Sequence, residues 1–272
     1  MKAVITCGGY GSRLLPFTKE VPKEMAPIFY RIDDRIQTKP LIQLIFENLY
    51  DAGVREFCFI TGKTKRVIEN HFTPDGSSND DNMQIFFKKL KNSKIFWITQ
   101  NEPKGFGDAV KYAESFVGNE SFILQAGDVS LIPNNLELLK KMMERPTENE
   151  DAIISVRTVD DPKRHGIVKL TDENDISNVT YAIEKPDVPP TNLGIMPIYR
   201  FKNNIFECLK KINPGKNNEL QITDAIQKLI ENENKVKAIR VDKEEFLDVG
   251  TPDAYWTALK KSHNFSEDGL WK

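Results

Sequence analysis

The apolar and polar positions of the first 160 residues follow two alternating periods. Short apolar runs between turn residues predict β-strands at 2–7, 55–60, 94–99, 121–126 and 152–158. Between these runs, apolar residues recur at every third or fourth position and predict helices at 40–52, 63–71, 107–117 and 134–144. Strands that alternate with helices in this way predict a Rossmann-like α/β fold, in which helices sandwich a mixed, mostly parallel sheet.

The pattern changes near residue 160, where short polar turns separate the apolar runs. These later runs predict antiparallel additions to the sheet at 166–170, 176–184 and 195–201. The elements expected after them are helices at 203–211 and 219–232, strands at 235–241 and 245–248, and a closing helix from Pro252 to about Ser262. Residues 73–82 are expected to form a polar surface loop, and the last ten residues a loosely held tail.

Composition narrows the class of protein and its partners. The chain has 272 residues, of which 39% are hydrophobic, so it can bury a large core. Its net charge of −2 lacks the positive field that attracts nucleic acid. The three cysteines form no CxxC pair, and no apolar run approaches the ~18 residues of a membrane span. We therefore expect a cytoplasmic protein with buried thiols that binds neither nucleic acid nor membrane.

A glycine-rich segment directly follows the first predicted strand. Gly8, Gly9 and Gly11 are succeeded by Arg13 and, ten residues later, by Lys23. Glycine permits positive φ angles and lets a phosphate approach the backbone. Arginine offers a planar fork to phosphate oxygens and lysine a compact charge. The segment fits a phosphate-binding loop, and it equally fits a tight turn with two solvated cations.

Two better-known glycine motifs do not match this chain. A dinucleotide-binding loop reads G-x-G-x-x-G, but Leu14 stands at its third glycine position. A P-loop reads G-x-x-x-x-G-K-[ST], but the chain's only Gly-Lys-Thr, at 62–64, has Phe57 where the first glycine belongs. These mismatches argue against a nicotinamide-dependent oxidoreductase and against a P-loop enzyme.

Two aspartates follow apolar strands that lie far apart in the sequence. Asp128 comes after the strand at 121–126, and Asp248 ends the strand at 245–248. Ligands of such a sheet bind at the carboxyl ends of its strands. Each aspartate alone fits a turn or a helix cap, but two carboxylates beside a phosphate loop suit Mg²⁺, which takes few protein carboxylates together with phosphate and water.

Eight segments in order resemble the sugar nucleotidyltransferase family. "GGYGSRLLPFTKEVPKEMAP" (8–27) is similar to its G-x-G-T-R-L-x-P-x-T-x-x-x-P-K signature, and "TKEVPKEMAP" looks most like the prokaryotic UTP–glucose-1-phosphate uridylyltransferase branch. The likeness continues through "KPLIQ" (39–43), "GKTKRVIENHF" (62–72), "GFGDAV" (105–110), "GD" (127–128), "EKP" (184–186), "ELQITDAI" (219–226) and "DVGTP" (248–252). It covers nearly the whole chain.

The resemblance implies a nucleotide-diphospho-sugar transferase fold and a Mg²⁺-dependent reaction. UTP and glucose 1-phosphate would give UDP-glucose and pyrophosphate. It also implies a single domain at 1–265, with 1–158 binding the nucleotide and 159–265 the sugar phosphate, a tail at 266–272, and a homo-oligomer. The alternatives are a thymidylyltransferase that takes dTTP and a catalytically silent regulatory member of the family. Other hexose 1-phosphates also stay open as substrates.

The resemblance further implies a role for individual residues of this chain. The nucleotide phosphates would lie against Gly8, Gly9, Gly11, Ser12 and Gly127, and the pyrimidine against Gln100 and Gly105. Arg13 and Lys23 would neutralise the departing pyrophosphate. Mg²⁺ would be held by Asp128 and Asp248. The hexose would be surrounded by Gly166, Glu184 and Gly194, and Lys185 would contact its phosphate.

This chain departs from the family pattern at four places. They are Ser12 for threonine, Asp108 for the histidine of "GLGHAV", Asn217-Asn218 for two glycines, and a longer segment at 30–38. The implied chemistry is intact, because a sugar phosphate is already ionised and needs no general base. The departures bear on the choice of nucleotide and sugar.

Overall fold

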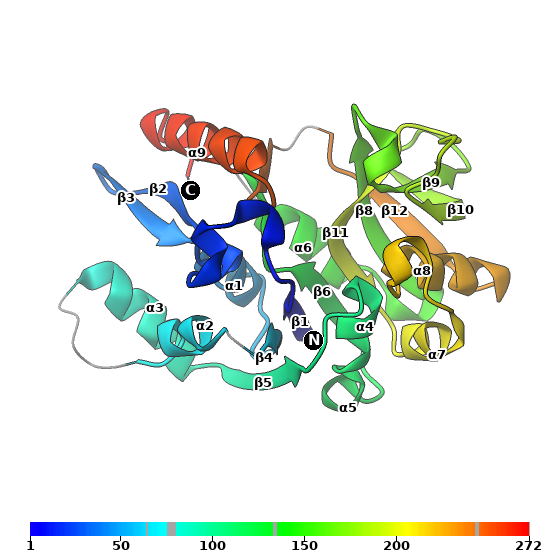
Figure 1. The fold of residues 1–272 in the computed structure, drawn as a ribbon, viewed down its shortest axis with the longest axis horizontal. Helices are drawn as coiled ribbons and strands as arrows, with labels where there is room; N and C mark the ends of the chain where they lie inside the picture. The colour runs from blue at the N-terminus through cyan, green and yellow to red at the C-terminus, as the bar shows by residue number, and fades with distance from the viewer. Residues whose placement is uncertain (64, 75–79, 133–134, 243–244, 272) are drawn as a thin grey trace.

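The protein is described by a computed structural model that covers residues 1–63, 65–74, 80–132, 135–242 and 245–271. In these residues, nine strands form a central sheet in the order β5-β4-β1-β6-β11-β8-β12-β10-β9 (Figure 1). Their bounds are β1 Lys2–Cys7, β4 Glu56–Gly62, β5 Lys94–Gln100, β6 Phe122–Ala126, β8 Ala152–Thr158, β9 Gly166–Leu170, β10 Ile176–Glu184, β11 Leu193–Phe201 and β12 Val236–Arg240. The predicted strands are confirmed.

The sheet is parallel at one end and mixed at the other. Strands β5, β4, β1 and β6 pair in parallel. Strand β11 then runs antiparallel to both β6 and β8, and β10 runs antiparallel to β12 and β9. Strand β11 thus inserts between β6 and β8, two strands that precede it in the chain. Eight of its nine residues are buried, as a central strand requires.

Helices cover both faces of the sheet, as predicted. The helices are α1 Leu41–Asp51, α2 Arg66–His71, α3 Asp81–Lys91, α4 Phe106–Lys111, α5 Glu114–Val117, α6 Asn135–Glu144, α7 Asn204–Lys211, α8 Ile222–Glu231 and α9 Pro252–Glu267. One core joins Ala3 and Ile5 of β1 to α1, α2, α3, α6 and α9. A second joins Val4 to α4, α5, α7 and α8. Successive residues of β1 therefore point into opposite cores.

Two small sheets were not predicted. Strands β2 (Pro27–Ile32) and β3 (Arg35–Pro40) form a hairpin that contains the long segment 30–38. Its second strand reads RIQTKP and has no buried residue, so it carries no apolar signal. Strand β7 (Val129–Ile132) pairs antiparallel with β13 (Glu245–Asp248). This second pairing sets Asp248 opposite Val129, the residue after Asp128.

Several predicted boundaries differ from the structure. The helix expected at 107–117 is divided into α4 and α5, and α8 begins at Ile222. Residues 75–79 of the loop predicted at 73–82 lie outside the described residues. The same is true of residue 64 in the helix predicted at 63–71, residue 134 in the helix predicted at 134–144, and residue 272 of the predicted tail. Helix α3 begins within the predicted loop, where the Asp80 side chain accepts from the backbone N–H groups of Asn82 and Met83.

The last ten residues are not the loosely held tail that was expected. Helix α9 continues to Glu267, and the indole N–H of Trp271 donates to the Ser266 hydroxyl at 2.9 Å and to the Ser262 carbonyl. Trp271 also packs against the first core. The end of the described chain is therefore docked on the fold.

Short 3₁₀ helices complete the fold. They are η1 Ser12–Leu14, η2 Phe17–Lys19, η3 Lys23–Met25, η4 Thr147–Asn149, η5 Pro162–Arg164 and η6 Lys216–Asn218. Among the helices that the structure describes, none has the length and apolar character needed to cross a membrane.

Candidate active site

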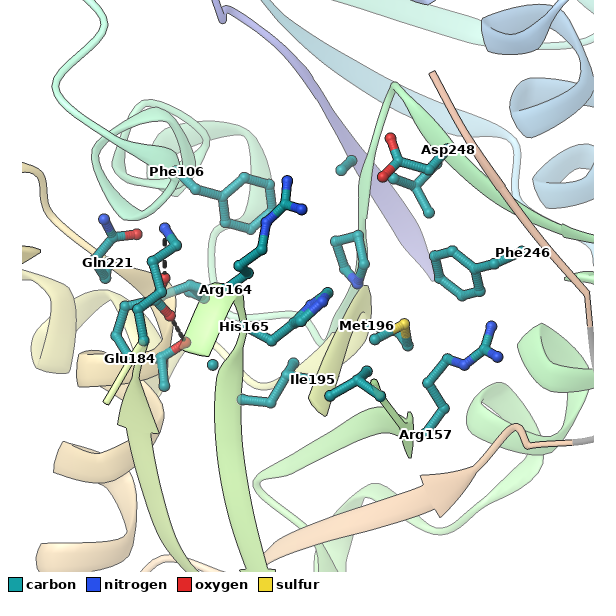
Figure 2. A pocket seen from close by; sticks show the side chains of 18 of the residues that line it. Phe106, Arg157, Arg164, His165, Glu184, Ile195, Met196, Gln221, Phe246 and Asp248 are labelled. Carbon is teal, nitrogen blue, oxygen red and sulfur yellow. Dashed lines mark hydrogen bonds and ion pairs between the residues drawn. The ribbon is translucent and has the colours of Figure 1, made fainter. Parts of the chain in front are cut away.

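Three adjoining cavities lie at the carboxyl ends of the parallel strands. The large cavity, of about 640 Å³, is lined by Arg13, Asp128, Glu184, Lys185 and Asp248 among others. Figure 2 shows Glu184 and Gln221 at one end of it and Phe246 and Asp248 at the other. The loop cavity, of about 400 Å³, is lined by the glycine-rich segment 8–13 with Lys23, Gln100 and Gly105, and it shares Arg13 and Asp128 with the large cavity.

A smaller space adjoins the loop cavity. This lysine cavity, of about 220 Å³, is lined by Gly8, Gly9, Lys23, Lys65 and Gln100 among others. Lys23 and Gln100 thus border two cavities each. The five charged residues that the sequence singled out, at 13, 23, 128, 185 and 248, accordingly line two cavities that share a wall.

The glycine-rich segment leaves β1 in a conformation that depends on two of its glycines. Gly11 has a φ of 66°, and a Cβ atom there would lie 3.1 Å from the Thr18 side chain. A Cβ atom on Gly8 would lie 2.5 Å from Oε1 of Gln100. The Thr18 hydroxyl donates to the Gly11 carbonyl at 2.7 Å. Positive φ and close approach, rather than chain flexibility, explain why glycine stands at these positions.

Lys23 and Asp128 form an ion pair between the loop cavity's two walls. Burial opposes both charges, but the Asp128 carboxylate raises the pKa of Lys23, and the Lys23 ammonium lowers the pKa of Asp128. Both side chains are therefore charged at neutral pH. The predicted phosphate-binding lysine and the predicted metal-binding aspartate thus neutralise each other.

A buried ion pair lies next to Lys23 in the fold. The Lys65 ammonium lies 2.8 Å from both carboxylate oxygens of Glu24, the residue next to Lys23. Both side chains are almost fully buried. Burial raises the pKa of Glu24 in spite of this partner. The only signal of this pair in the sequence is that both residues lie in segments that carry the family resemblance.

Asp128 and Asp248 converge at Gly250. A Cβ atom on Gly250 would lie 2.9 Å from Oδ1 of Asp248, 3.4 Å from Nη2 of Arg13 and 3.9 Å from Oδ2 of Asp128. The Gly250 N–H donates to Asp248 at 2.6 Å. Burial and the neighbouring Asp128 raise the pKa of Asp248. The two carboxylates repel each other in this partly buried place, so an added cation would stabilise them.

The described residues contain no group of three or more His, Cys, Asp or Glu side chains that could hold a metal ion. The two aspartates fit Mg²⁺, because this ion is often held by one or two carboxylates and completes its shell with water and phosphate oxygens. They do not fit a zinc site, which needs three or four protein ligands.

Gln100 and Asp108 meet at the end of β5 and the start of α4. The Gln100 side-chain nitrogen donates to Oδ2 of Asp108 at 2.8 Å, and both residues are buried. Gly105 precedes α4 with a φ of 110°, and a Cβ atom there would lie 2.6 Å from the Leu220 carbonyl oxygen. Two backbone hydrogen bonds of 2.8 Å, from the Gly107 N–H to the Leu220 carbonyl and from the Leu220 N–H to the Lys104 carbonyl, hold this segment against "ELQITDAI".

Glu184 is held by two neighbours in the large cavity. One carboxylate oxygen lies 2.9 Å from the Lys185 ammonium, and the other accepts from the Thr223 hydroxyl at 2.6 Å. A Cβ atom on Gly166 would lie only 2.4 Å from that hydroxyl oxygen. Thr223 was not singled out by the sequence analysis. Only its place in "ELQITDAI" signals a role.

Two predicted site residues lie outside the walls of these cavities as the structure describes them. A Cβ atom on Gly127 would lie 2.7 Å from Sγ of Cys7, and one on Gly194 would lie 2.7 Å from the Val159 side chain. Close packing explains both glycines. Contacts of either residue with a nucleotide or a sugar stay predictions.

The large cavity also has walls that the sequence analysis missed. Among its lining residues are Arg157, Arg164, His165, Met196 and Phe246 (Figure 2). Burial lowers the pKa of His165, so its ring is neutral at pH 7. Arg157 and Arg164 add positive charge to the cavity. They come from segments without a sequence motif, so only the fold reveals them.

The comparisons with known proteins agree with this geometry. The UTP–glucose-1-phosphate uridylyltransferase of Bacillus subtilis is 37% identical over 243 residues, which cover 85% of this chain and 80% of the relative. The UTP–glucose-1-phosphate uridylyltransferase 1 of Staphylococcus saprophyticus is 34% identical over 262 residues, which cover 92% of this chain and 88% of the relative.

A solved structure, UDP-glucose pyrophosphorylase complexed with UDP-glucose, has a TM-score of 0.86 and 28% identity, covering 97% of this chain and 98% of that chain. The family model described as nucleotidyl transferase matches residues 2–264. With the glycine loop, the paired carboxylates and the flanking cations on one edge of the sheet, this chain belongs to the nucleotidyl transferase family.

Proposed function

We propose that this protein is a UTP–glucose-1-phosphate uridylyltransferase. A phosphate oxygen of glucose 1-phosphate would attack the α-phosphorus of UTP. The new bond joins that oxygen to phosphorus, the bond between the α- and β-phosphates breaks, and pyrophosphate leaves. The observation that carries the proposal is the shared wall of the two cavities, where Arg13 and Asp128 separate a glycine-rich phosphate loop from the pocket of Glu184 and Lys185.

The two substrates are assigned to the two cavities by charge and shape. The nucleotide suits the loop cavity, which is lined by residues 8–12 together with Arg13 and Lys23. Glucose 1-phosphate suits the large cavity, where Glu184 can accept hydrogen bonds from sugar hydroxyls and Lys185 can contact the phosphate. The curated relatives carry uridylyltransferase names, which favours UTP over dTTP.

The residues act by positioning and neutralising charge. Two phosphorylated substrates repel each other, and Arg13, Lys23 and Lys185 place positive charge on both sides of their meeting point. No residue has to accept a proton, because the attacking phosphate is already ionised. Asp128 and Asp248 would hold Mg²⁺, which supplies further neutralisation of phosphate charge when bound.

The direct test is a pyrophosphate-release assay on the purified chain with UTP, glucose 1-phosphate and Mg²⁺. UDP-glucose is identified in the product, and dTTP and other hexose 1-phosphates are supplied in parallel reactions. We expect release that requires both substrates and stops with a metal chelator. A chain that prefers dTTP would be a thymidylyltransferase, and one that releases no pyrophosphate under any condition would contradict the proposal.

Thr223→Val is expected to raise the KM for glucose 1-phosphate about 10-fold with little change in the KM for UTP. Valine has nearly the same shape but cannot donate to Glu184, and a hydrogen bond to a charged group contributes about 1.5–3 kcal/mol. Thr223→Ser keeps the hydroxyl and serves as the matched control, with a KM within about twofold of the original. Equal sugar KM values for the two variants would remove Thr223 from the sugar site.

A further inference from the structure

Gln100 has a partner that determines which end of its amide faces the cavities. Gln100 is the last residue of β5, and Asp108 lies in the first turn of α4. The side-chain nitrogen of Gln100 donates to Oδ2 of Asp108 at 2.8 Å. Gln100 is 2% exposed and Asp108 8% exposed, so the pair lies within the protein and not on a solvated surface.

The chemistry of the pair allows one orientation of the amide. A glutamine amide carries a donor nitrogen and an acceptor oxygen that have nearly the same shape, so an isolated amide can present either end. A carboxylate can only accept hydrogen bonds. Reversing the amide would place its oxygen against the Asp108 carboxylate, with repulsion in place of a hydrogen bond. The Gln100 nitrogen is therefore held toward Asp108.

The Gln100 oxygen in turn lies beside the glycine loop. A Cβ atom on Gly8 would be 2.5 Å from this oxygen, and Gln100 lines both the loop cavity and the lysine cavity. The ring nitrogen N3 of uracil and thymine carries a hydrogen and donates. N3 of cytosine has no hydrogen and accepts. An amide held with its oxygen free matches the first kind of base edge and opposes the second.

We infer that Asp108 is a positioning residue that fixes the Gln100 amide so that the nucleotide site accepts uracil and thymine bases and rejects cytosine. The inference rests on the proposed function, in which Gln100 contacts the pyrimidine. It gives a physical role to the aspartate that stands where the resembling branch has histidine. Asp108 is not among the residues that line the three cavities, so its effect on the base would pass through Gln100.

The test compares UTP with CTP in the wild type and in Asp108→Asn. Asparagine has the same shape but can donate or accept, so the Gln100 amide can reverse. We expect the ratio of kcat/KM for UTP to that for CTP to fall at least about 10-fold. The KM for glucose 1-phosphate should stay within about twofold. The control is Asp253→Asn, which removes the same negative charge from an exposed residue of α9 and should keep the wild-type ratio.

A double variant restores the hydrogen bond between positions 100 and 108 with the donor and the acceptor exchanged. In Gln100→Glu with Asp108→Asn, the asparagine nitrogen can donate to the new carboxylate, whose other oxygen faces the base. We expect the preference for UTP over CTP to return. Gln100→Glu alone places two carboxylates side by side and should lose UTP affinity. If Asp108→Asn does not fold, the double variant tests the inference in its place. A folded double variant without a preference for UTP contradicts the inference.

The outcomes separate the inference from the proposed function. A wild type that makes UDP-glucose together with an unchanged UTP to CTP ratio in folded Asp108→Asn overturns the inference alone. A wild type without uridylyltransferase activity overturns the proposed function. A fall in the ratio with an equal rise in the KM for glucose 1-phosphate would indicate a general structural role and would also overturn the inference.

Discussion

Lys23→Ala is expected to lower the turnover number at least about 10²-fold, the effect of removing one preorganised electrostatic group from an active site. Lys23 lies in the loop cavity and pairs with Asp128. Its loss removes positive charge beside the departing pyrophosphate and leaves a buried carboxylate without its counter-ion. Asp128→Asn should reduce turnover to a similar extent. Initial rates at saturating UTP and glucose 1-phosphate measure both effects.

The control for this prediction is Lys94→Ala, which removes a lysine whose side chain is 72% exposed on β5. Its turnover should stay within about twofold of the wild type, since exposed ion pairs contribute little. Circular dichroism and melting temperature establish that each variant is folded. Near-normal turnover by folded Lys23→Ala and Asp128→Asn would remove both residues from the catalytic machinery.

Lys65→Met is expected to lower the free energy of unfolding by about 3–5 kcal/mol at pH 8, because removing one partner of a buried ion pair leaves the other charge uncompensated. Lys65 contacts both oxygens of Glu24 at 2.8 Å, and the side chains are 8% and 2% exposed. Urea denaturation followed by circular dichroism measures the change. The double variant Lys65→Met with Glu24→Leu should recover part of the lost stability.

The stability deficit of Lys65→Met should shrink as the pH falls from 8 toward 5. Burial already raises the pKa of Glu24, and the loss of Lys65 raises it further. A carboxyl group with a raised pKa in the folded state favours folding fully below its unfolded pKa and loses this contribution as the pH rises. Lys89→Met, which removes the partner of the half-exposed Asp51, should cost less than about 1 kcal/mol. A deficit below this value at pH 8 in Lys65→Met would show that the buried pair is dispensable.

Local patterns in the sequence were sufficient for the elements of the main sheet. Strands such as β1 and β6 each contain a run of three neighbouring apolar residues, so a few positions are enough to reveal them. The hairpin of β2 and β3 was not predicted because its second strand is polar. That strand is stabilised by pairing with β2 and by helix α9, which packs against the hairpin. Helix α9 likewise extends past its periodic region because Trp271 closes its end.

The cytoplasmic location and the homo-oligomer stay predictions. The same holds for the Mg²⁺ dependence and for the roles of the individual site residues, which the experiments above are designed to test.

The sequence by itself determined which chemical groups the site contains, because the glycine loop and the flanking lysines, arginines and aspartates can be recognised within short segments. Only the tertiary structure decided which of them meet. Asp128 and Asp248 are neighbours because β7 pairs with β13, and Asp108 reaches Gln100 because α4 folds back across the end of β5. Helical and strand periodicity depends on residues a few positions apart, whereas these contacts depend on how distant strands pair and how helices pack on the sheet.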